Sequence, residues 1–171
     1  YDTAPAYGDE GLGETIMAPF IKAHKDEIIV TTKCGYDIHA ERPKEHSERP
    51  HNWSRESIIS QTEDSLRRLG LESIDLMQLH NARIDAVESD ELFETLDELV
   101  AQGKIKYYGV ALGPAIGWEK EGLESLNKRD IKSLQTVYNL LEQEPGKTFA
   151  NHAACQEGKV SMMARVPHAS D

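Results

Sequence analysis

Short apolar runs alternate along this chain with longer amphipathic segments. Runs rich in β-branched and other apolar residues predict strands at 28–32, 73–79, 105–112, 131–138 and 160–166, and residues 1–3 resemble the end of a sixth strand. Several of these runs are almost continuously apolar, which is typical of strands buried on both faces. The pattern therefore predicts a sheet covered on both sides.

Two of the intervening segments have clear helical periodicity. In the first, Ser54 is a suitable N-cap and Gly70 a suitable stop, and one face carries Ile58, Thr62, Leu66 and Leu69. The second is predicted to begin after Ser89–Asp90 and to end at Gly103, with one face formed by Leu92, Leu96 and Leu99. Both helices follow a predicted strand, as expected of β/α units.

Three further helices are predicted from weaker patterns. Leu12, Ile16 and Phe20 recur at helical spacing, although Pro19 is expected to kink or interrupt that helix because proline lacks an amide hydrogen. Weaker helical segments lie near 117–128 and 148–157.

Strand–helix alternation predicts an α/β fold with a parallel sheet, either an open doubly wound sheet or a TIM barrel. The dinucleotide fingerprint of doubly wound folds is missing, since GDEGLG at 8–13 has the wrong spacing and lies too far from the strand end. Polar candidates instead recur at the carboxyl ends of several strands, where barrel enzymes build their sites. These two observations favour the (β/α)8 barrel.

The predicted barrel is incomplete. A closed barrel has eight strands and takes roughly 250 residues, whereas this chain of 171 residues begins inside a strand and stops just after another. We therefore expect one partial barrel domain over 1–171, without its first and eighth strands. Such a barrel would expose unpaired edges, which favour self-association.

Composition narrows the function. The formal net charge of −11 argues against a nucleic-acid partner and against an anionic membrane surface. No apolar stretch approaches the roughly 18 residues of a membrane span, and no signal peptide opens the chain. Cys34 and Cys155 are therefore expected to be reduced thiols in a cytoplasmic protein.

The segment 34–53 is predicted to be a long irregular loop at the rim of the site. It contains His39, His46 and His51, but their spacing matches no metal-binding pattern. A solvated lid or substrate loop is the favoured interpretation, since long loops in compact domains are usually functional or disordered.

Four polar residues near strand ends are the candidates for chemistry: Asp2, Tyr7, Lys33 and His80. Each has a simpler explanation: a turn cap, a buried aromatic, a surface lysine or a core histidine. A parallel barrel would bring their loops to one rim. There the ammonium ion would favour loss of the phenol's proton, the carboxylate would keep the lysine charged, and the imidazole would orient a carbonyl oxygen.

The motifs DTAPAYG, VTTKCG and DLMQLHN resemble those of the aldo-keto reductases. The resemblance continues in that family's order through SLRRLGLESIDLMQLHN, GKIKYYGVALG, QTVYNLLEQ and MMARVPHAS, so that it spans essentially the whole chain. It implies that Tyr7 is the general acid and Lys33 the cation that tunes it. Asp2 would then pair with Lys33, and His80 would orient the substrate oxygen.

The resemblance also implies a nicotinamide cofactor, more often NADPH than NADH. Gln135 matches a residue that contacts the nicotinamide carboxamide, and Asn81 lies close to the same rim. Two positions depart from the common pattern. Ala111–Leu112–Gly113 stands where many members have a serine and an asparagine, and Arg165 where many have a stacking aromatic; a guanidinium can also stack on a planar ring.

The expected function is interconversion of a carbonyl compound (an aldehyde, ketone or sugar) and an alcohol, so the expected partner is a small molecule. Two alternatives stay open: a catalytically silent nicotinamide-binding or regulatory member, and an inactive truncated fragment, because the family's main phosphate-binding segment would lie beyond Asp171. A hydrolase is disfavoured since no G-x-S-x-G motif occurs. The sequence does not indicate the oligomeric state.

Overall fold

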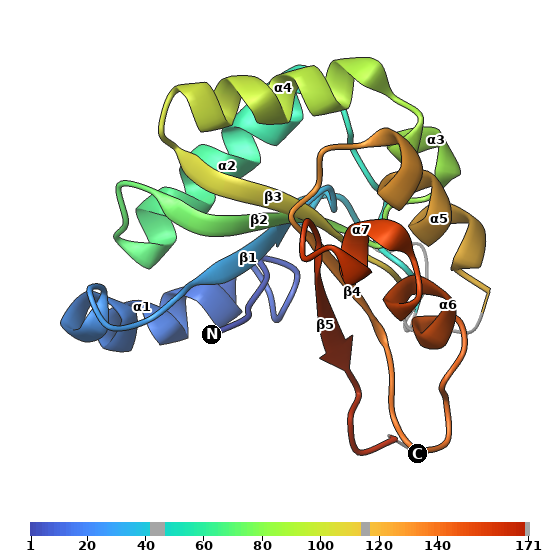
Figure 1. Ribbon diagram of the computed structural model, residues 1–171. Helices are drawn as coiled ribbons and strands as arrows, with labels where there is room; N and C mark the ends of the chain where they lie inside the picture. Colours follow the sequence, from blue (N-terminus) through green and yellow to red (C-terminus); the bar gives the residue numbers. More distant parts are fainter. Residues whose placement is uncertain (42–46, 114–116, 170–171) are drawn as a thin grey trace. The chain divides into compact units, whose positions relative to one another are not determined.

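The computed structural model describes residues 1–41, 47–113 and 117–169 (Figure 1). Its five strands are β1 (Thr31–Cys34), β2 (Ile74–His80), β3 (Ile105–Ala111), β4 (Ser133–Val137) and β5 (Ser161–Arg165). Its helices are α1 (Leu12–His24), α2 (Arg55–Leu69), α3 (Ile84–Val87), α4 (Asp90–Ala101), α5 (Glu119–Lys128), α6 (Gly146–Ala150) and α7 (Ala153–Gln156). Among the described residues, none of these helices is long and apolar enough to cross a membrane.

The strands form one sheet in the order β1-β2-β3-β4-β5. β3 pairs with β4 and β4 with β5 in parallel, with Gly109 opposite Ser133 and Ser133 opposite Ser161. Strands that follow the chain order without a reversal are typical of a β/α barrel, whereas doubly wound sheets reverse at a switch point. The predicted parallel α/β architecture is confirmed.

The chain divides into two compact units. The first comprises Tyr1–Met77 and Asp90–Tyr107, and the second Gln78–Ser89 and Tyr108–Asp171. The first parts of β2 and β3 therefore belong to the first unit, together with β1, and their carboxyl ends to the second, together with β4 and β5.

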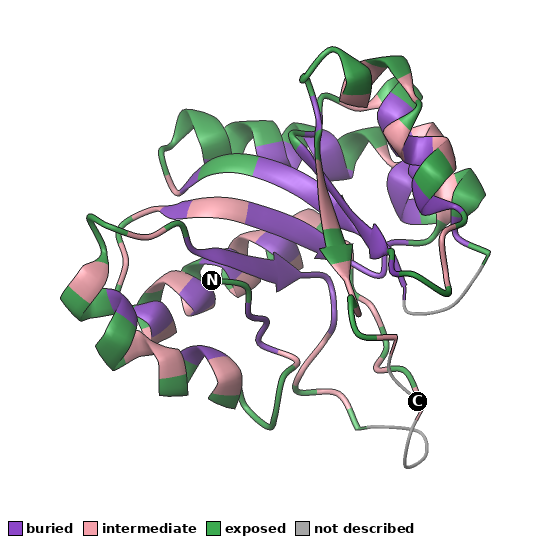
Figure 2. Ribbon diagram, turned by 60° about the horizontal axis from the view of Figure 1, so that its bottom comes forward, coloured by how far each residue is buried: buried purple, intermediate pink, exposed green. Residues whose placement is uncertain are grey.

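In the first unit α2 contacts both α1 and α4 and packs against β1. Helix α2 begins where expected: the Ser54 hydroxyl accepts a hydrogen bond from the Ser57 amide, and Gly70 ends the helix in the left-handed conformation. Strand β1 is buried along its whole length, whereas every residue of β5 in the second unit is exposed or intermediate, and the helices alternate between buried and exposed faces (Figure 2). The core side chains of this unit include Ile21, Ile58, Leu69, Ile74, Leu96 and Leu99.

In the second unit α5 contacts α3 and α6, and α6 contacts α7. Arg129, just after α5, donates from Nε to the Val87 carbonyl at the end of α3, at 2.7 Å. The core of this unit includes Leu79, Val110, Leu112, Leu126, Leu134 and Phe149. This packing holds the carboxyl ends of β2, β3 and β4 in a compact frame.

The first predicted strand differs from the observed one. The apolar run suggests 28–32, whereas β1 spans Thr31–Cys34. Ile29 is largely exposed, and the Val30 amide donates to the Asp75 carboxylate at 2.8 Å. The apolar run therefore marks the approach to the sheet, and regular pairing begins later.

Two helical predictions also differ. Helix α1 continues through Pro19, which is exposed, so water can satisfy the carbonyl that loses its amide partner. The single helix predicted near 148–157 is divided into α6 and α7. His152 separates them, and its imidazole accepts a hydrogen bond from the Ala154 amide. The one-turn helix α3 was not predicted from the sequence.

Candidate functional site

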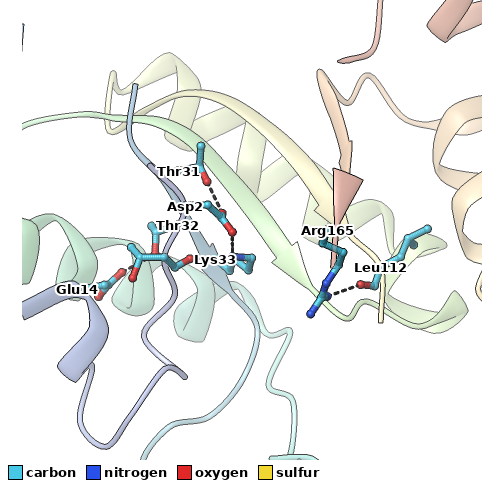
Figure 3. A network of polar contacts seen from close by, with 8 residues as sticks. Asp2, Glu14, Thr31, Thr32, Lys33, Leu112 and Arg165 are labelled. Carbon is cyan, nitrogen blue, oxygen red and sulfur yellow. Dashed lines mark hydrogen bonds and ion pairs between the residues drawn. The ribbon is translucent and has the colours of Figure 1, made fainter. Parts of the chain in front are cut away.

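Lys33, on β1, is a charged residue in the interior of the first unit. Its side chain is fully buried, with Nζ 2.7 Å from Asp2 Oδ2 and 2.9 Å from the Thr3 carbonyl oxygen (Figure 3). A buried ammonium ion is tolerated only when it is paired and hydrogen-bonded, and these two acceptors supply that environment. The predicted ion pair between Lys33 and Asp2 therefore forms.

Asp2 is held in place by both its backbone and its side chain. Its backbone forms a parallel bridge with Thr31, and the Thr3 amide donates to the Thr31 carbonyl at 3.0 Å. The second carboxylate oxygen accepts a hydrogen bond from the Thr31 hydroxyl. Since the Asp2 side chain is 31% exposed, the pair with Lys33 reaches from the buried strand to the surface.

Tyr7 lies beside the Lys33–Asp2 pair, and the three residues form one polar cluster. The Lys33 Nζ lies over its ring, 4.9 Å from the centroid, within the range of a cation–π contact. The loop backbone is fixed by hydrogen bonds from the Tyr7 amide to the Ala4 carbonyl and from the Gly13 amide to the Tyr7 carbonyl, at 3.1 and 2.8 Å. Tyr7 is 42% exposed. Tyr7 is therefore partly exposed to solvent beside a buried cation.

His80 and Asn81 end β2 in the second unit, and both are buried. The Asn81 amide donates to the Ala111 carbonyl at 2.8 Å, which ties the end of β2 to the end of β3. Asn81 has a φ of 54°, in the left-handed region, which asparagine adopts more readily than most residues. The structure thus brings Asp2, Tyr7 and Lys33 together in one unit and His80 next to Asn81 in the other.

Gln135 lies on β4 and Arg165 at the end of β5, both in the second unit. The Leu112 amide donates to the Gln135 carbonyl at 2.8 Å, and the Arg165 guanidinium donates from Nη1 to the Leu112 carbonyl at 2.9 Å (Figure 3). The Gln135 side chain is buried and the Arg165 side chain half-buried. Asn81, Gln135 and Arg165 are therefore linked through residues 111–112 at the carboxyl ends of neighbouring strands.

The chemistry of this donor set fits a nicotinamide ring. A nicotinamide carboxamide needs both a donor and an acceptor, and the amides of Asn81 and Gln135 each provide both. The guanidinium of Arg165 is planar and can stack on a flat ring. These three residues could hold the nicotinamide end of a cofactor.

The described parts of the segment after β1 contact each other. Tyr36 pairs with His51 in an antiparallel bridge, and their rings stack at 4.2 Å, with Trp53 stacked on the other side of His51 at 4.8 Å. These ends and α2 line a cavity of about 360 Å³. His46 lies outside the described residues. Among the residues that are described, no three His, Cys, Asp or Glu side chains gather as a metal site would require.

Neither thiol resembles a nucleophile. Burial raises the pKa of Cys34 to about 12 and also raises that of Cys155. A thiol with a raised pKa is almost entirely protonated at neutral pH, and the thiolate is the reactive form.

Sequence reasoning missed several groups that support this site. The Thr31 hydroxyl and the Thr3 carbonyl both bind members of the Lys33–Asp2 pair, and backbone acceptors carry no sequence signal. A second missed cluster lies beside it: the fully buried Glu14 carboxylate accepts from the Thr32 hydroxyl and from Arg68 Nε, both at 2.6 Å. Within this second cluster, the only sequence signal was the position of Thr32 next to Lys33.

The fold and these motifs define the class to which the chain belongs. The sequence profile of the Aldo/keto reductase family matches residues 1–170. The chain is therefore a member of the aldo/keto reductase family, and its five-stranded parallel sheet is part of that family's barrel.

Particular relatives extend the comparison. The chain is 31% identical to the 6-dehydroglucose reductase of Agrobacterium fabrum, over 97% of this chain and 55% of that protein. It superposes on the holo form of aldo-keto reductase AKR11C1 from Bacillus halodurans with a TM-score of 0.81 and 34% identity, covering 98% of this chain and 52% of that one. An aldo/keto reductase from Klebsiella pneumoniae, solved with NADP and acetate, gives a TM-score of 0.69 and 26% identity, with 98% and 52% covered. The chain spans about half the length of the curated relatives it matches.

Proposed function

We propose that the protein catalyses the reversible reduction of a small carbonyl compound to an alcohol, with Tyr7 as the proton donor. The observation that carries this proposal is the buried Lys33–Asp2 pair beside the Tyr7 ring, with a 2.7 Å contact within the pair and 4.9 Å from Nζ to the ring centroid. Burying a lysine is costly, and a lysine needed only for solubility would lie at the surface.

In the proposed reaction Tyr7 donates its hydroxyl proton to the carbonyl oxygen as that oxygen gains negative charge. The Lys33 ammonium ion stabilises the phenolate that remains, because a cation close to a phenol favours its ionised form. Asp2 keeps Lys33 charged and fixes its position through two carboxylate contacts, one to Lys33 and one to Thr31. Oxidation of the alcohol runs through the same groups in reverse.

We further propose that His80 hydrogen-bonds the substrate oxygen, and that Asn81, Gln135 and Arg165 hold the nicotinamide end of NADPH, with NADH as the possible substitute. When bound, this cofactor supplies the hydride, which no side chain can deliver. The Klebsiella relative solved with NADP, and the reductase named in Agrobacterium, support this assignment. Aldehydes, ketones and sugars all remain within the substrate class.

The test is reduction of a panel of aldehydes, ketones and sugars by the purified natural protein, followed by the loss of reduced cofactor. We expect Tyr7→Phe to lower kcat/KM by at least the roughly 100-fold that accompanies loss of a general acid, with cofactor affinity nearly unchanged. The matched control is Tyr107→Phe, which removes the hydroxyl of an exposed tyrosine on β3.

The possible outcomes separate the alternatives. Turnover that survives in Tyr7→Phe would remove Tyr7 from the proposed role. Tight nicotinamide binding without turnover of any carbonyl would identify a silent or regulatory member. Failure to bind either cofactor would contradict the whole proposal.

A further inference from the structure

The cavity of about 360 Å³ lies within the first unit, and its lining differs from the cluster of Asp2, Tyr7 and Lys33. One wall is a face of α2, since residues three and four positions apart are neighbours on a helix. The residues of this face are Ser57, Ser60, Gln61, Asp64 and Arg68. The lining also includes Pro5 and the segment 36–39. Sites for small molecules have volumes of about 300–1,000 Å³, so a molecule of monosaccharide size fits this cavity.

The polar side chains of the cavity are held in place by the protein itself. Gln61 accepts a hydrogen bond from the Gly35 amide at Oε1 and donates from Nε2 to the Ser57 hydroxyl, at 2.7 and 2.8 Å. Asp37 Oδ1 accepts from the amides of residues 39 and 40, at 3.0 and 3.1 Å. Ordering of side chains on binding weakens affinity, and these side chains are ordered before a ligand arrives.

The same side chains retain capacity for further hydrogen bonds. A carboxylate has about four acceptor sites, and Asp37 uses one of its two oxygens in the bonds above. The Ser57 hydroxyl accepts from Gln61 and keeps its own proton as a donor. Arg68 binds Glu14 through Nε, and its Nη1 remains a donor at the cavity wall. The cavity therefore offers both donors and acceptors.

The charges of the lining argue against an anionic ligand. Three carboxylates line the cavity, those of Asp37, Glu56 and Asp64, and the one permanently charged cation is Arg68. Asp64 is paired with Arg67, and Arg68 with a buried carboxylate. Asp37 and Glu56 still leave an excess of negative charge, which repels a phosphate or carboxylate group.

The remaining choice is between an ammonium ion and a hydroxylated molecule. An ammonium ion only donates hydrogen bonds, so it would leave the donors of Ser57, Gln61 and Arg68 without an acceptor, and desolvated donors without a partner weaken binding. A hydroxyl group both donates and accepts. Pro5 and Ile38 add apolar surface to the lining, on which the C–H face of a sugar ring can pack.

We propose that this cavity binds a neutral sugar or polyol of about monosaccharide size, through Asp37 and the α2 face that carries Ser57, Gln61 and Arg68. The site is separate from the residues assigned to proton transfer, and the inference does not require the proposed reaction to occur. Pro5 lies two residues before Tyr7, so a ligand in the cavity would contact the loop that carries the proposed acid.

The test is direct binding of D-glucose, D-sorbitol and myo-inositol to the purified natural protein, without cofactor. Saturation-transfer NMR detects weak binding of small molecules, and a titration gives the Kd. We expect saturable binding of at least one of the three, with a Kd that changes little with ionic strength because the ligand is neutral. Spermidine is the rival probe, since binding of a cation to carboxylates weakens as salt is added.

Two variants locate the binding. Ser60→Trp places an indole in the cavity from an exposed position on α2 and should abolish the binding, whereas Glu94→Trp adds the same side chain on the exposed face of α4 as its matched control. Asp37→Asn keeps an oxygen for the two amides but replaces the other oxygen by an amino group. It should raise the Kd by about 10- to 100-fold, the effect of losing a hydrogen bond to a charged group. Asp26→Asn, at an exposed position after α1, should leave the Kd unchanged.

Three results would overturn the inference, provided that circular dichroism shows each protein to be folded. The wild-type protein could bind none of the three polyols. Binding could persist unchanged in Ser60→Trp, which would place the ligand elsewhere in the molecule. The protein could instead prefer spermidine and lose it at high salt, which would assign the cavity to a cation. None of these measurements involves turnover, so the proposed function and this inference can fail separately.

Discussion

Two carboxylate–cation pairs lie on opposite sides of strand β1, and they are built differently. Lys33 points to one face of the strand and pairs with Asp2, whereas its neighbour Thr32 points to the other face and bonds Glu14. Asp2 is 31% exposed, while Glu14 is fully buried and also pairs with Arg68. One pair therefore opens towards solvent beside a phenol, whereas the other lies between α1 and α2 with its carboxylate fully buried and its Arg68 side chain 18% exposed.

The difference between the two pairs indicates that one has a structural role and that the other is suited to the proposed reaction. Glu14 is in the first turn of α1 and Arg68 in the last turn of α2, so each charge also complements the dipole of its own helix. This pair is suited to holding the two helices and β1 in register. In the other pair, Lys33 lies over the ring of Tyr7, the proposed proton donor.

The largest effect on this comparison is expected from Lys33→Met. Methionine has a similar length but no charge, so the cation that is proposed to stabilise the Tyr7 phenolate is lost. We expect kcat/KM to fall by more than about 100-fold, as for loss of an acid–base group, while the protein stays folded. Steady-state kinetics and circular dichroism measure the two quantities. Activity close to that of the wild-type protein would show that this pair is structural, like its neighbour.

The next effect concerns the pair of Glu14 and Arg68. Glu14→Ala leaves Arg68 without its carboxylate in a largely buried place, and the free energy of unfolding should fall by about 3–5 kcal/mol. Urea denaturation measures it. The control is Asp64→Ala, which removes the pair with Arg67, whose side chain is 74% exposed, and it should cost no more than about 1 kcal/mol.

A double variant sharpens this result. If Glu14 and Arg68 are both replaced by leucine, the loss of stability should be smaller than for Glu14→Ala, because no unpaired charge remains buried. If Glu14→Ala were as stable as the wild-type protein, the buried Glu14–Arg68 pair would not contribute to stability as proposed.

The smallest effect is expected in thiol labelling of Cys34, which lies on the face of β1 that carries Thr32. Cys34 follows Lys33, so its side chain shares the face of Thr32, and it is only 1% exposed. Since burial raises its pKa to about 12, a thiol reagent at neutral pH should label the half-buried Cys155 first and Cys34 only after denaturant is added. Mass spectrometry of the labelled peptides gives the order. Early labelling of Cys34 would mean that this face opens readily.

Much of the fold follows from local patterns, while the contacts around the site do not. The strands at 73–79, 105–112 and 160–166 were predicted to within one residue at either end, because their apolar runs coincide with paired backbone. The strand that carries Lys33 was placed too early, since Ile29 in the apolar run is largely exposed and the Val30 amide donates to the Asp75 side chain instead of to a strand backbone.

The candidate site shows the same limit. The ion pair of Asp2 and Lys33 could be predicted because both residues belong to recognisable motifs. The buried Glu14–Arg68 pair could not, since its members are 54 positions apart and each reads as an ordinary charge on a helix. The catalytic roles of Tyr7 and His80 and the cofactor contacts of Asn81 stay predictions.

Asn81 combines two requirements that rarely coincide. Its left-handed backbone, with a φ of 54°, costs most residues about 1–2 kcal/mol, which glycine and asparagine largely avoid. Its buried side chain is proposed to bind a carboxamide, which glycine cannot do. Glutamine would keep the side-chain amide but would not favour the left-handed backbone conformation. Glycine would favour that conformation but has no side-chain amide. Few single substitutions at this position preserve both properties, so evolutionary drift here should be narrow even where the surrounding loops diverge freely.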